Sequence, residues 1–523
     1  MLRRAEGAPH RLPPCYGVPF RTYSGTDVQG YHRYILLFVF LVAGLLIAAA
    51  ANAQIQRPKL VVGLVVDQMR WDYLYYYNNE YGNDGLKRLL NQGFSFENTH
   101  INYAPTVTAI GHSSVYTGSI PAFTGIAGNS FYQDDKSVYC CEDNTVKSVG
   151  SDSKEGQMSP RRMLTSTIGD ELQVATDFRS KVIGVALKDR ASILPAGHAA
   201  DAAYWWDTSA GRFVSSTFYM DRLPQWVEDF NAKNHTDPNF DIKGSPQGVT
   251  MTFKMAEAAL KNEKLGKGKE TDMLTVSISS TDIIGHRFST RGKENHEVYM
   301  QLDKDLAWFL KMLDKEVGEG NYLLFLTADH GAAHNYNYMR EHRIPAGGWD
   351  YKQTVKDLNA YLQGKFGISP VMGEDNYQFY LNDSTIEAAG KKKQEIIDES
   401  VEWLKKDPQF LYVFDEEKIS ETTMPNWIKE RMQNGYFRGR SGEIGIVTRP
   451  QFFGGKDRPD FRGTQHGQPF PYDTHIPFLL FGWNVKHGAS NIETHIVDIA
   501  PTVCAMLHIQ MPNGCVGKAR NQF

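Results

Sequence analysis

Residues 59–67, Lys-Leu-Val-Val-Gly-Leu-Val-Val-Asp, form an almost continuous apolar run that ends in a carboxylate, Asp67. A run of this kind, without alternating polar residues, is typical of a strand that is buried on both faces in a parallel sheet. In open α/β sheets, ligands bind at the carboxyl ends of the strands. Asp67 therefore stands where a metal-binding carboxylate is expected.

Two further apolar runs, residues 273–279 and 322–327, predict buried strands of the same kind. The metal-ligating residue types that follow these runs are Asp282, His286, Asp329 and His330. Because the carboxyl ends of parallel strands meet at one edge of a sheet, these side chains are expected to converge with Asp67. The pattern predicts one shared metal centre at the strand ends.

Strand and helix patterns along the chain predict an α/β fold, with a mostly parallel central sheet sandwiched by helices. Helical spacing is strongest over residues 249–263 and 297–317, and residues 181–187 predict another buried strand. From about residue 350 to 448 the sequence changes to charged helices and short irregular strands. This change indicates a smaller inserted subdomain within a catalytic domain that spans residues 54–523.

The N-terminal region has the features of an export signal. Residues 34–51 are apolar, follow scattered arginines and lead into Ala51-Asn52-Ala53, a pattern that signal peptidase cuts, here before Gln54. Residues 1–53 are therefore predicted to be a signal peptide, and the mature protein to be periplasmic or secreted, without a stable membrane span. The alternative is an uncleaved anchor, because an apolar stretch of about 18 residues approaches the length of a membrane span.

The composition excludes some partners and leaves the disulfides open. A formal net charge of −4, with no long basic run, argues against nucleic acid as a dedicated partner. Of the five cysteines, Cys15 lies in the predicted signal peptide, and the others are Cys140, Cys141, Cys504 and Cys515. Export would permit disulfides, and Cys504 and Cys515 are close enough in sequence to pair, but the sequence does not give the connectivity.

The candidate ligands combine carboxylates and imidazoles. They are Asp67, Asp282, His286, Asp329, His330 and His466. Such mixed ligation suits zinc and related divalent ions. Six ligands are too many for one tetrahedral ion with an open position, but they fit two ions with three ligands each. Two ions about 3.5–4 Å apart can hold the attacking and leaving oxygens of a displacement at phosphorus. The other histidines weighed, expected to be structural or to support ligands, are His112, His198, His334 and His475.

The expected nucleophile is a threonine. Thr108 follows a turn at Pro105 and precedes small residues at a predicted helix start, where backbone N–H groups favour an anion. Its hydroxyl would be activated by coordination to a metal instead of by a neighbouring base. Either Thr106 or Thr108 could instead simply cap the helix, and residue chemistry alone barely separates the two threonines.

Seven motifs occur in order along the chain: Val-Val-Asp67-Gln-Met-Arg, Thr-Val-Thr108-Ala-Ile-Gly-His, Gly-Asn129, Lys188-Asp-Arg190, Asp282-Ile-Ile-Gly-His286, Ala-Asp329-His330-Gly and Gln-His466-Gly. This series resembles the alkaline phosphatase superfamily, and more narrowly the PafA-type (phosphate-irrepressible) alkaline phosphatases. The resemblance extends over about residues 59–518.

The resemblance implies a role for each motif residue. The implied ligands are Asp282, His286 and His466 for one zinc ion, and Asp67, Asp329 and His330 for the other. Thr108 would lie between the two ions, coordinated to them, and would form a phosphothreonine intermediate. Asn129, Lys188 and Arg190 would contact the non-bridging phosphoryl oxygens, because a monoester dianion carries extra charge that needs donors and cations.

Hydrolysis of small-molecule phosphate monoesters to an alcohol and inorganic phosphate is the predicted reaction. The first alternative is phosphodiester hydrolysis, because the resembling nucleotide pyrophosphatase/phosphodiesterase branch uses threonine with the same metal ligands. Lys188 and Arg190 favour monoesters, because the resemblance implies that the phosphodiesterase branch lacks a Lys-x-Arg pair in this role. A sulfatase would need Cys/Ser-x-Pro-x-Arg, which is absent at Thr108. A non-catalytic metal-binding protein is the second alternative, but it would not need the hydroxyl at position 108.

Overall fold

The computed structural model describes residues 17, 19, 34–35, 37–40, 56–237 and 239–523. Residues 57–523 form one compact unit. The predicted signal peptide, residues 1–53, and its cleavage site before Gln54 fall largely outside the described residues. None of the helices in the described part of the chain is both long enough and apolar enough to cross a membrane.

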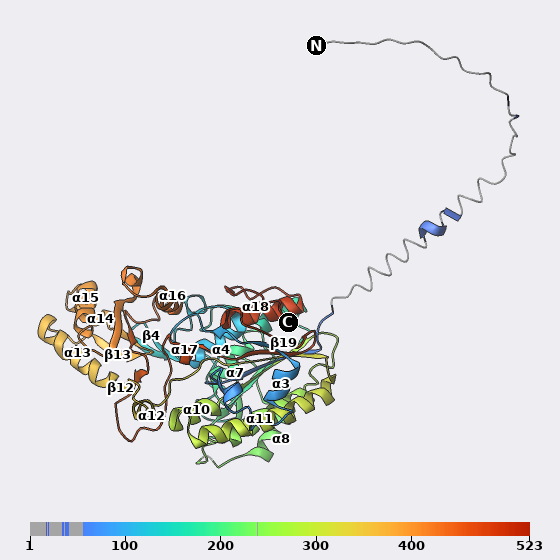
Figure 1. The fold of residues 1–523 in the computed structure, drawn as a ribbon, viewed down its shortest axis with the longest axis horizontal. Coiled ribbons are helices and arrows are strands. Elements are labelled where there is room, and N and C mark those ends of the chain that lie inside the picture. Colours follow the sequence, from blue (N-terminus) through green and yellow to red (C-terminus); the bar gives the residue numbers. More distant parts are fainter. Residues whose placement is uncertain (1–16, 18, 20–33, 36, 41–55, 238) are drawn as a thin grey trace, which may run out of the picture. The chain divides into compact units, whose positions relative to one another are not determined.

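The core of this unit is, among the described residues, a ten-stranded sheet (Figure 1). In spatial order its strands are β19 (Gly488–Ser490), β2 (Phe94–Phe96), β18 (Phe478–Gly482), β11 (Tyr322–Thr327), β1 (Leu60–Val66), β10 (Asp272–Ile278), β7 (Val182–Ala186), β8 (Ala202–Asp207), β9 (Arg212–Ser216) and β6 (Ser148–Val149). The central strands from β11 to β8 run parallel, and antiparallel pairings flank them on both sides. The predicted α/β fold with a mostly parallel central sheet is confirmed.

Strand register aligns the ends of three parallel strands. Val66, the last residue of β1, pairs with Ile278, the last residue of β10. Val65 pairs with Thr327, the last residue of β11. All residues of these strands are buried, which accounts for the unbroken apolar runs. The residues that follow the three strands, beginning with Asp67, therefore share one edge of the sheet.

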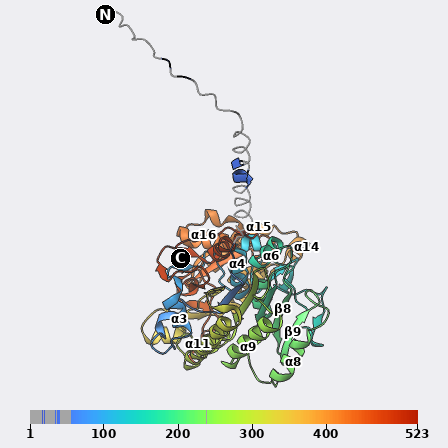
Figure 2. The same cartoon turned by 90° about the vertical axis from the view of Figure 1, so that its right-hand side faces the viewer.

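Helices cover both faces of the sheet (Figures 1 and 2). The helices that contact one another on one face are α4 (Thr108–Thr117), α6 (Ile168–Ala175), α7 (Asp189–Ala196) and α18 (Ile499–Leu507). Those on the other face are α3 (Leu86–Gln92), α8 (Gln225–Asn234), α9 (Gln247–Asn262), α10 (Ser280–Phe288) and α11 (Lys293–Leu313). Helix α4 carries the candidate nucleophile, and α10 carries two candidate ligands.

A smaller subdomain lies beside the main sheet, at the left of Figure 1. Its antiparallel sheet has the order β13 (Val371–Asp375), β14 (Gln378–Leu381), β16 (Ile444–Thr448) and β15 (Phe410–Asp415), and its helices are α13 (Tyr351–Phe366), α14 (Asp383–Ala388), α15 (Lys393–Leu404) and α16 (Asn426–Gly435). Trp349, Leu358, Phe379 and Ile446 belong to an apolar cluster separate from that of the main sheet. This is the subdomain expected from the sequence; its limits, about 350 and 448, stay a prediction.

The four cysteines of the described chain, Cys140, Cys141, Cys504 and Cys515, are free thiols. Cys504 is buried within α18, whereas the segment that contains Cys515 turns towards the end of α4, where the Val516 N–H donates to the Gly118 carbonyl. The structure forms no disulfide between Cys504 and Cys515, a pairing that their sequence proximity allowed. The Sγ atoms of Cys140 and Cys141 lie 3.9 Å apart.

A buried acid in the subdomain makes its stability depend on pH. Glu416 is 2% exposed, and its Oε2 has no hydrogen-bond partner among the described residues. Burial raises the pKa of Glu416 to about 8 from an ordinary value of 4.5. The neutral acid is thus favoured in the folded state, so its stabilising effect is complete below about pH 4.5 and is lost as the pH rises through 8. Each pKa unit is worth about 1.4 kcal/mol.

Glu416→Gln is therefore expected to flatten the loss of stability between about pH 5 and 8 by several kcal/mol. The measurement is the free energy of unfolding, or the Tm, across this pH range. Glu421→Gln, at an exposed position in the same segment, is the matched control and should keep the wild-type slope. Parallel pH profiles of wild type and Glu416→Gln would show that Glu416 is ionised at little cost in the folded protein.

Candidate metal centre

The predicted ligands converge at the carboxyl ends of β1, β10 and β11. Ligand atoms of Asp282, His286 and His466 lie within 4.8 Å of one another. Asp282 and His286 are one turn apart on α10, and their Oδ1 and Nε2 atoms are 3.1 Å apart. His466 comes from a loop far along the chain, and its Nε2 lies 3.3 Å from Nε2 of His286. These three residues form the first ligand group.

The second ligand group contains Asp67 and His330, but the structure places Asp282 in it as well. Ligand atoms of Asp67, Asp282 and His330 lie within 4.8 Å of one another. Asp329, the third member expected from the sequence, has its Oδ2 3.3 Å from Nε2 of His330. Asp282 thus lies within reach of both groups, whereas Asp329 lies next to the second group and its ligation of an ion stays a prediction.

The histidine tautomers fit a bound cation. Nδ1 of each ring donates to a backbone carbonyl: His286 to Thr464 O at 3.0 Å, His330 to Gly331 O at 2.9 Å and His466 to Thr106 O at 2.6 Å. In the neutral ring each Nε2 is then an acceptor that faces the centre, as a metal ligand must be. Two such nitrogens 3.3 Å apart cannot bond each other. A cation between them resolves this contact.

The buried carboxylate oxygens at the centre also fit a bound cation. Asp67 Oδ1 and Asp329 Oδ2 are buried without a hydrogen-bond partner among the described residues. Burial raises the pKa of Asp67, and the nearby carboxylates of Asp282 and Asp329 raise it further. Unpartnered, clustered carboxylate oxygens beside imidazole nitrogens match the preferences of zinc and related divalent ions.

Lys188 lies against these ligands. Its Nζ is 2.6 Å from Oδ2 of both Asp67 and Asp282, and the side chain is almost completely buried. Burial lowers the pKa of Lys188, but the two carboxylates outweigh this effect and raise it above its ordinary value. Lys188 is therefore charged and compensates part of the negative charge of the centre.

Of the two candidate threonines, Thr108 faces the centre. It is the first residue of α4, and its Oγ1 lies 3.5 Å from Nε2 of His330. Thr106 instead accepts a hydrogen bond from the N–H of Gly467 and donates to the Gln468 carbonyl. Gly111 lets α4 approach closely, because a Cβ there would lie 2.3 Å from the Asp329 carbonyl oxygen.

Asn129 lies beside the start of α4. Its Oδ1 accepts a hydrogen bond from the N–H of Ala109 at 2.9 Å. This contact fixes the orientation of the amide. Its NH₂ group makes no hydrogen bond with the residues that the structure describes. The group is thus free to donate to an anion near Thr108.

A tyrosine holds Arg190, a contact with no signal in the sequence. Tyr139, from the hairpin of β4 (Ser130–Gln133) and β5 (Lys136–Tyr139), accepts a hydrogen bond from Arg190 Nη1 at 3.0 Å and donates to Asp189 Oδ1 at 2.7 Å. We expect Tyr139→Phe to lower kcat/KM for an aryl phosphate monoester about tenfold, which corresponds to about 1.4 kcal/mol, because Arg190 loses its fixed orientation.

Tyr132→Phe in the same hairpin is the control, since its hydroxyl makes no hydrogen bond with the described residues that would be lost. Equal kcat/KM values for Tyr139→Phe and wild type would show that Arg190 needs no support from this hydroxyl.

The other weighed histidines lie outside the ligand groups. His112 is buried on α4, donates from Nδ1 to the Thr108 carbonyl and accepts at Nε2 from Ser277 Oγ. Its Nδ1 is also 3.3 Å from Asp329 Oδ2, so it supports a ligand without joining the group. The partners of the other three are Met163 O for His198, Thr290 Oγ1 for His334 and Glu97 O for His475.

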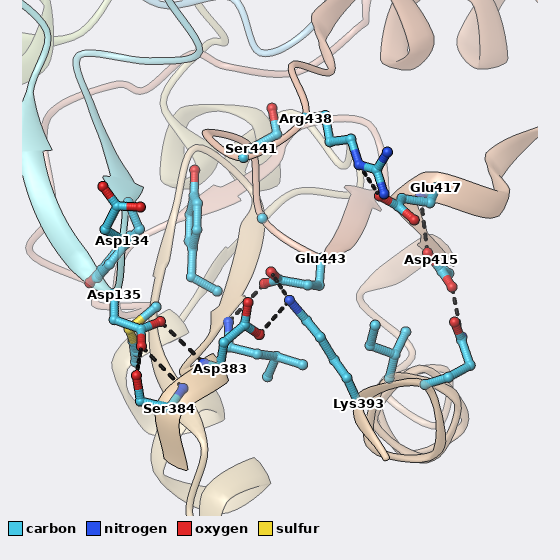
Figure 3. Close-up of a pocket in the computed structure, with 18 of the residues that line it drawn as sticks. Asp134, Asp135, Asp383, Ser384, Lys393, Asp415, Glu417, Arg438, Ser441 and Glu443 are labelled. Carbon is cyan, nitrogen blue, oxygen red and sulfur yellow. Dashed lines mark hydrogen bonds and ion pairs between the residues drawn. The ribbon is translucent and has the colours of Figure 1, made fainter. Parts of the chain in front are cut away.

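A cavity of about 780 Å³ lies away from this centre. It lies between the β4–β5 hairpin and the subdomain (Figure 3). Its charges are largely paired: Lys393 contacts Asp383 and Glu443, and Arg438 contacts Glu417. None of the predicted site residues lines it. A smaller cavity of about 170 Å³, lined in part by Tyr139 and Asp189, adjoins Arg190.

Comparisons with known proteins identify relatives along almost the whole chain. The family described as type I phosphodiesterase/nucleotide pyrophosphatase matches residues 61–469. A protein named calcium-transporting ATPase from Myroides odoratus is 44% identical, over 90% of this chain and 95% of its own. Alkaline phosphatase PafA from Elizabethkingia meningoseptica is 44% identical, over 92% and 97%. Alkaline phosphatase PhoV from Synechococcus elongatus is 43% identical, over 89% and 92%.

Among solved structures, the crystal structure of wild-type alkaline phosphatase PafA matches with a TM-score of 0.85 and 43% identity, covering 89% of this chain and 99% of that one. A second structure is of a PafA variant in which one threonine, one asparagine, one lysine and one arginine are replaced, and it matches equally well.

The chain therefore belongs to the type I phosphodiesterase/nucleotide pyrophosphatase family, within the alkaline phosphatase superfamily. The similarity to PafA and PhoV identifies it as an alkaline phosphatase, a hydrolase of phosphate monoesters.

Proposed function

We propose that this phosphatase acts with two zinc ions and with Thr108 as its nucleophile. The observation that carries the proposal is the convergence of two ligand groups on the start of α4, with the Thr108 hydroxyl 3.5 Å from Nε2 of His330. The proposed ligands are Asp282, His286 and His466 for one ion, and Asp67, Asp329 and His330 for the other. Bound there, the ions supply positive charge that favours an ionised nucleophile and leaving group.

The chain's own residues would then act in sequence. The Thr108 oxygen attacks phosphorus, a threonine–phosphorus bond forms, and the bond from phosphorus to the alcohol oxygen breaks. Water then hydrolyses the phosphothreonine and restores the hydroxyl. The N-terminus of α4 and the free NH₂ group of Asn129 donate to phosphoryl oxygens, and Lys188 and Arg190 balance the charge of the monoester dianion.

The spacing of these residues supports their assignment. Asn129 follows Thr108 by 21 residues (129 − 108), and Arg190 follows Lys188 by two. The threonine and asparagine replaced in the PafA variant are also 21 residues apart, and its lysine and arginine two apart. The contacts also support the assignment. Lys188 bonds the carboxylates of Asp67 and Asp282, and Arg190, two residues later, donates a hydrogen bond to the Tyr139 hydroxyl.

We also propose that the protein is exported to the periplasm or the medium after removal of residues 1–53. The support is the apolar stretch at residues 34–51 and the Ala51-Asn52-Ala53 pattern before Gln54. Mass spectrometry of the mature N-terminus tests this proposal, and a mature chain that retains the apolar stretch would favour a membrane anchor.

Substrate preference tests the roles of Lys188 and Arg190. For Lys188→Ala/Arg190→Ala, we expect kcat/KM on an aryl phosphate monoester to fall by about 10³-fold or more, since two charge-assisted contacts to the dianion are lost. The corresponding methyl diester carries one charge less and should be affected much less. The measurement is the ratio of kcat/KM for the two substrates.

The matched control is Arg179→Ala/Lys181→Ala, the same pair of residue types with the same spacing at the other end of β7, where Lys181 and Arg179 form surface ion pairs. It should keep both activities. A wild-type preference for the diester, unchanged in Lys188→Ala/Arg190→Ala, would assign the site to phosphodiester hydrolysis and overturn the roles proposed for both side chains.

A further inference from the structure

The residue after the first ligand has an unusual backbone. Gln68 has φ 65°, in the left-handed region that non-glycine residues rarely adopt, and it is 4% exposed. A buried residue held in such a conformation persists where its surroundings impose it, and such residues concentrate at functional sites. The contacts of Gln68 show what imposes it here.

Gln68 bonds one carboxylate from each ligand group. Its backbone N–H donates to Asp329 Oδ1 at 3.0 Å. Its side-chain Nε2 donates to Asp282 Oδ1 at 2.6 Å. Asp329 follows β11 and Asp282 lies on α10, so the two bonds join segments on opposite sides of β1. The left-handed turn is what allows the N–H and the amide of one residue to reach both.

The facing helix leaves room for this amide. A Cβ on Gly285 would lie 2.0 Å from Gln68 Oε1, so only glycine lets α10 approach here. Gly285 stands between the ligands Asp282 and His286 on the same helix. The amide is therefore enclosed by the helix that carries two ligands, and its Nε2 is directed at Asp282.

We propose that Gln68 is a positioning residue that ties the two ligand groups together, fixing Asp282 and Asp329 relative to each other so that two divalent cations bind as a pair. Partners that orient metal ligands are worth about 10–100-fold in metal affinity. The inference rests on the proposed metal centre, because it assigns Gln68 a role only toward cations held by these carboxylates.

Two variants separate the amide from the backbone. Gln68→Gly removes the amide and relieves the left-handed conformation, whereas Gln68→Met keeps the length of the side chain and the conformation but lacks the donor. The probe is Zn²⁺, titrated into the metal-free protein against a competing chromogenic chelator, with bound zinc counted by elemental analysis. The Tm of the metal-free protein is measured in parallel. Asn484→Gly, at an exposed residue with φ 55°, is the backbone control.

We expect both Gln68 variants to bind zinc about 10–100-fold more weakly than wild type, while Asn484→Gly binds it normally. The metal-free Tm of Gln68→Gly should equal or exceed that of wild type, since glycine relieves the backbone. Wild-type zinc affinity in both variants would overturn the role of Gln68, and so would a lower metal-free Tm in Gln68→Gly, which would mark the residue as structural. A wild-type protein that binds no zinc would instead overturn the metal centre itself, together with this inference.

Discussion

Thr108→Ala is expected to lower kcat/KM for an aryl phosphate monoester by about 10⁴-fold or more, because the group that attacks phosphorus is removed and water must replace it. Thr108→Ser, which keeps the hydroxyl, should retain most of the activity. The measurement combines steady-state kinetics with single-turnover kinetics, which detect a phosphoenzyme in wild type and none in Thr108→Ala. Zinc content should be determined for each variant, since all six ligands remain in place.

Thr106→Ala is the matched control, since it removes the same hydroxyl two residues earlier on the same segment. The Thr106 hydroxyl bonds the loop at residues 467–468, and the backbone carbonyl that orients His466 survives the substitution. We expect a loss of less than about tenfold for Thr106→Ala. A larger loss of kcat/KM for Thr106→Ala than for Thr108→Ala would contradict this assignment and make Thr106 the nucleophile.

Removal of the metal should abolish activity altogether. Treatment with a strong chelator is expected to reduce turnover below detection, and Zn²⁺ should restore it, because the paired carboxylates and imidazoles cannot by themselves replace the charge of the cations. The Tm should fall as well, since a ligand present at 1,000 times its Kd contributes about 4 kcal/mol of stability. Activity and Tm are measured before chelation, after it and after repletion.

Among single ligands, Asp282 should be the most sensitive, because its carboxylate lies within reach of both ligand groups. Asp282→Asn is expected to lower kcat/KM by about 10³-fold or more and to reduce zinc content. Asp272→Asn is the control, at the start of β10, the strand that leads into α10; its carboxylate bonds only backbone N–H groups. Full activity after chelation, or in Asp282→Asn, would contradict a metal-dependent mechanism.

The local parts of the site could be predicted from the sequence because an apolar run marks each strand and a ligating residue follows its end. Each of the three apolar runs leads within a few residues to a ligating aspartate, Asp67, Asp282 or Asp329, and register in a parallel sheet then brings those residues to one edge. His466 follows no such strand, so the strand-end argument does not extend to it. Residue chemistry alone barely separates Thr106 from Thr108, because the contact of the Thr106 hydroxyl with the loop at residues 467–468 depends on segments far apart in the chain.

Other features depend on contacts between distant segments, which no local pattern encodes. Tyr139 reaches Arg190 from a hairpin, and Gln68 reaches Asp282 only because Gly285 leaves space for its amide. Asp282 was assigned to one ligand group, yet it lies near both. The sequence also left the pairing of Cys504 and Cys515 open, and both are free thiols in the structure.

The order of the ligands along the chain has a consequence for biosynthesis. Asp67 and His466 are separated by 399 residues (466 − 67), and the other ligands lie between them. A chain that has emerged only in part therefore holds an incomplete set, and contacts this distant in sequence form late in folding. Only a chain translated and folded through His466 can therefore bind both ions, and a polypeptide that ends earlier lacks the complete first ligand group.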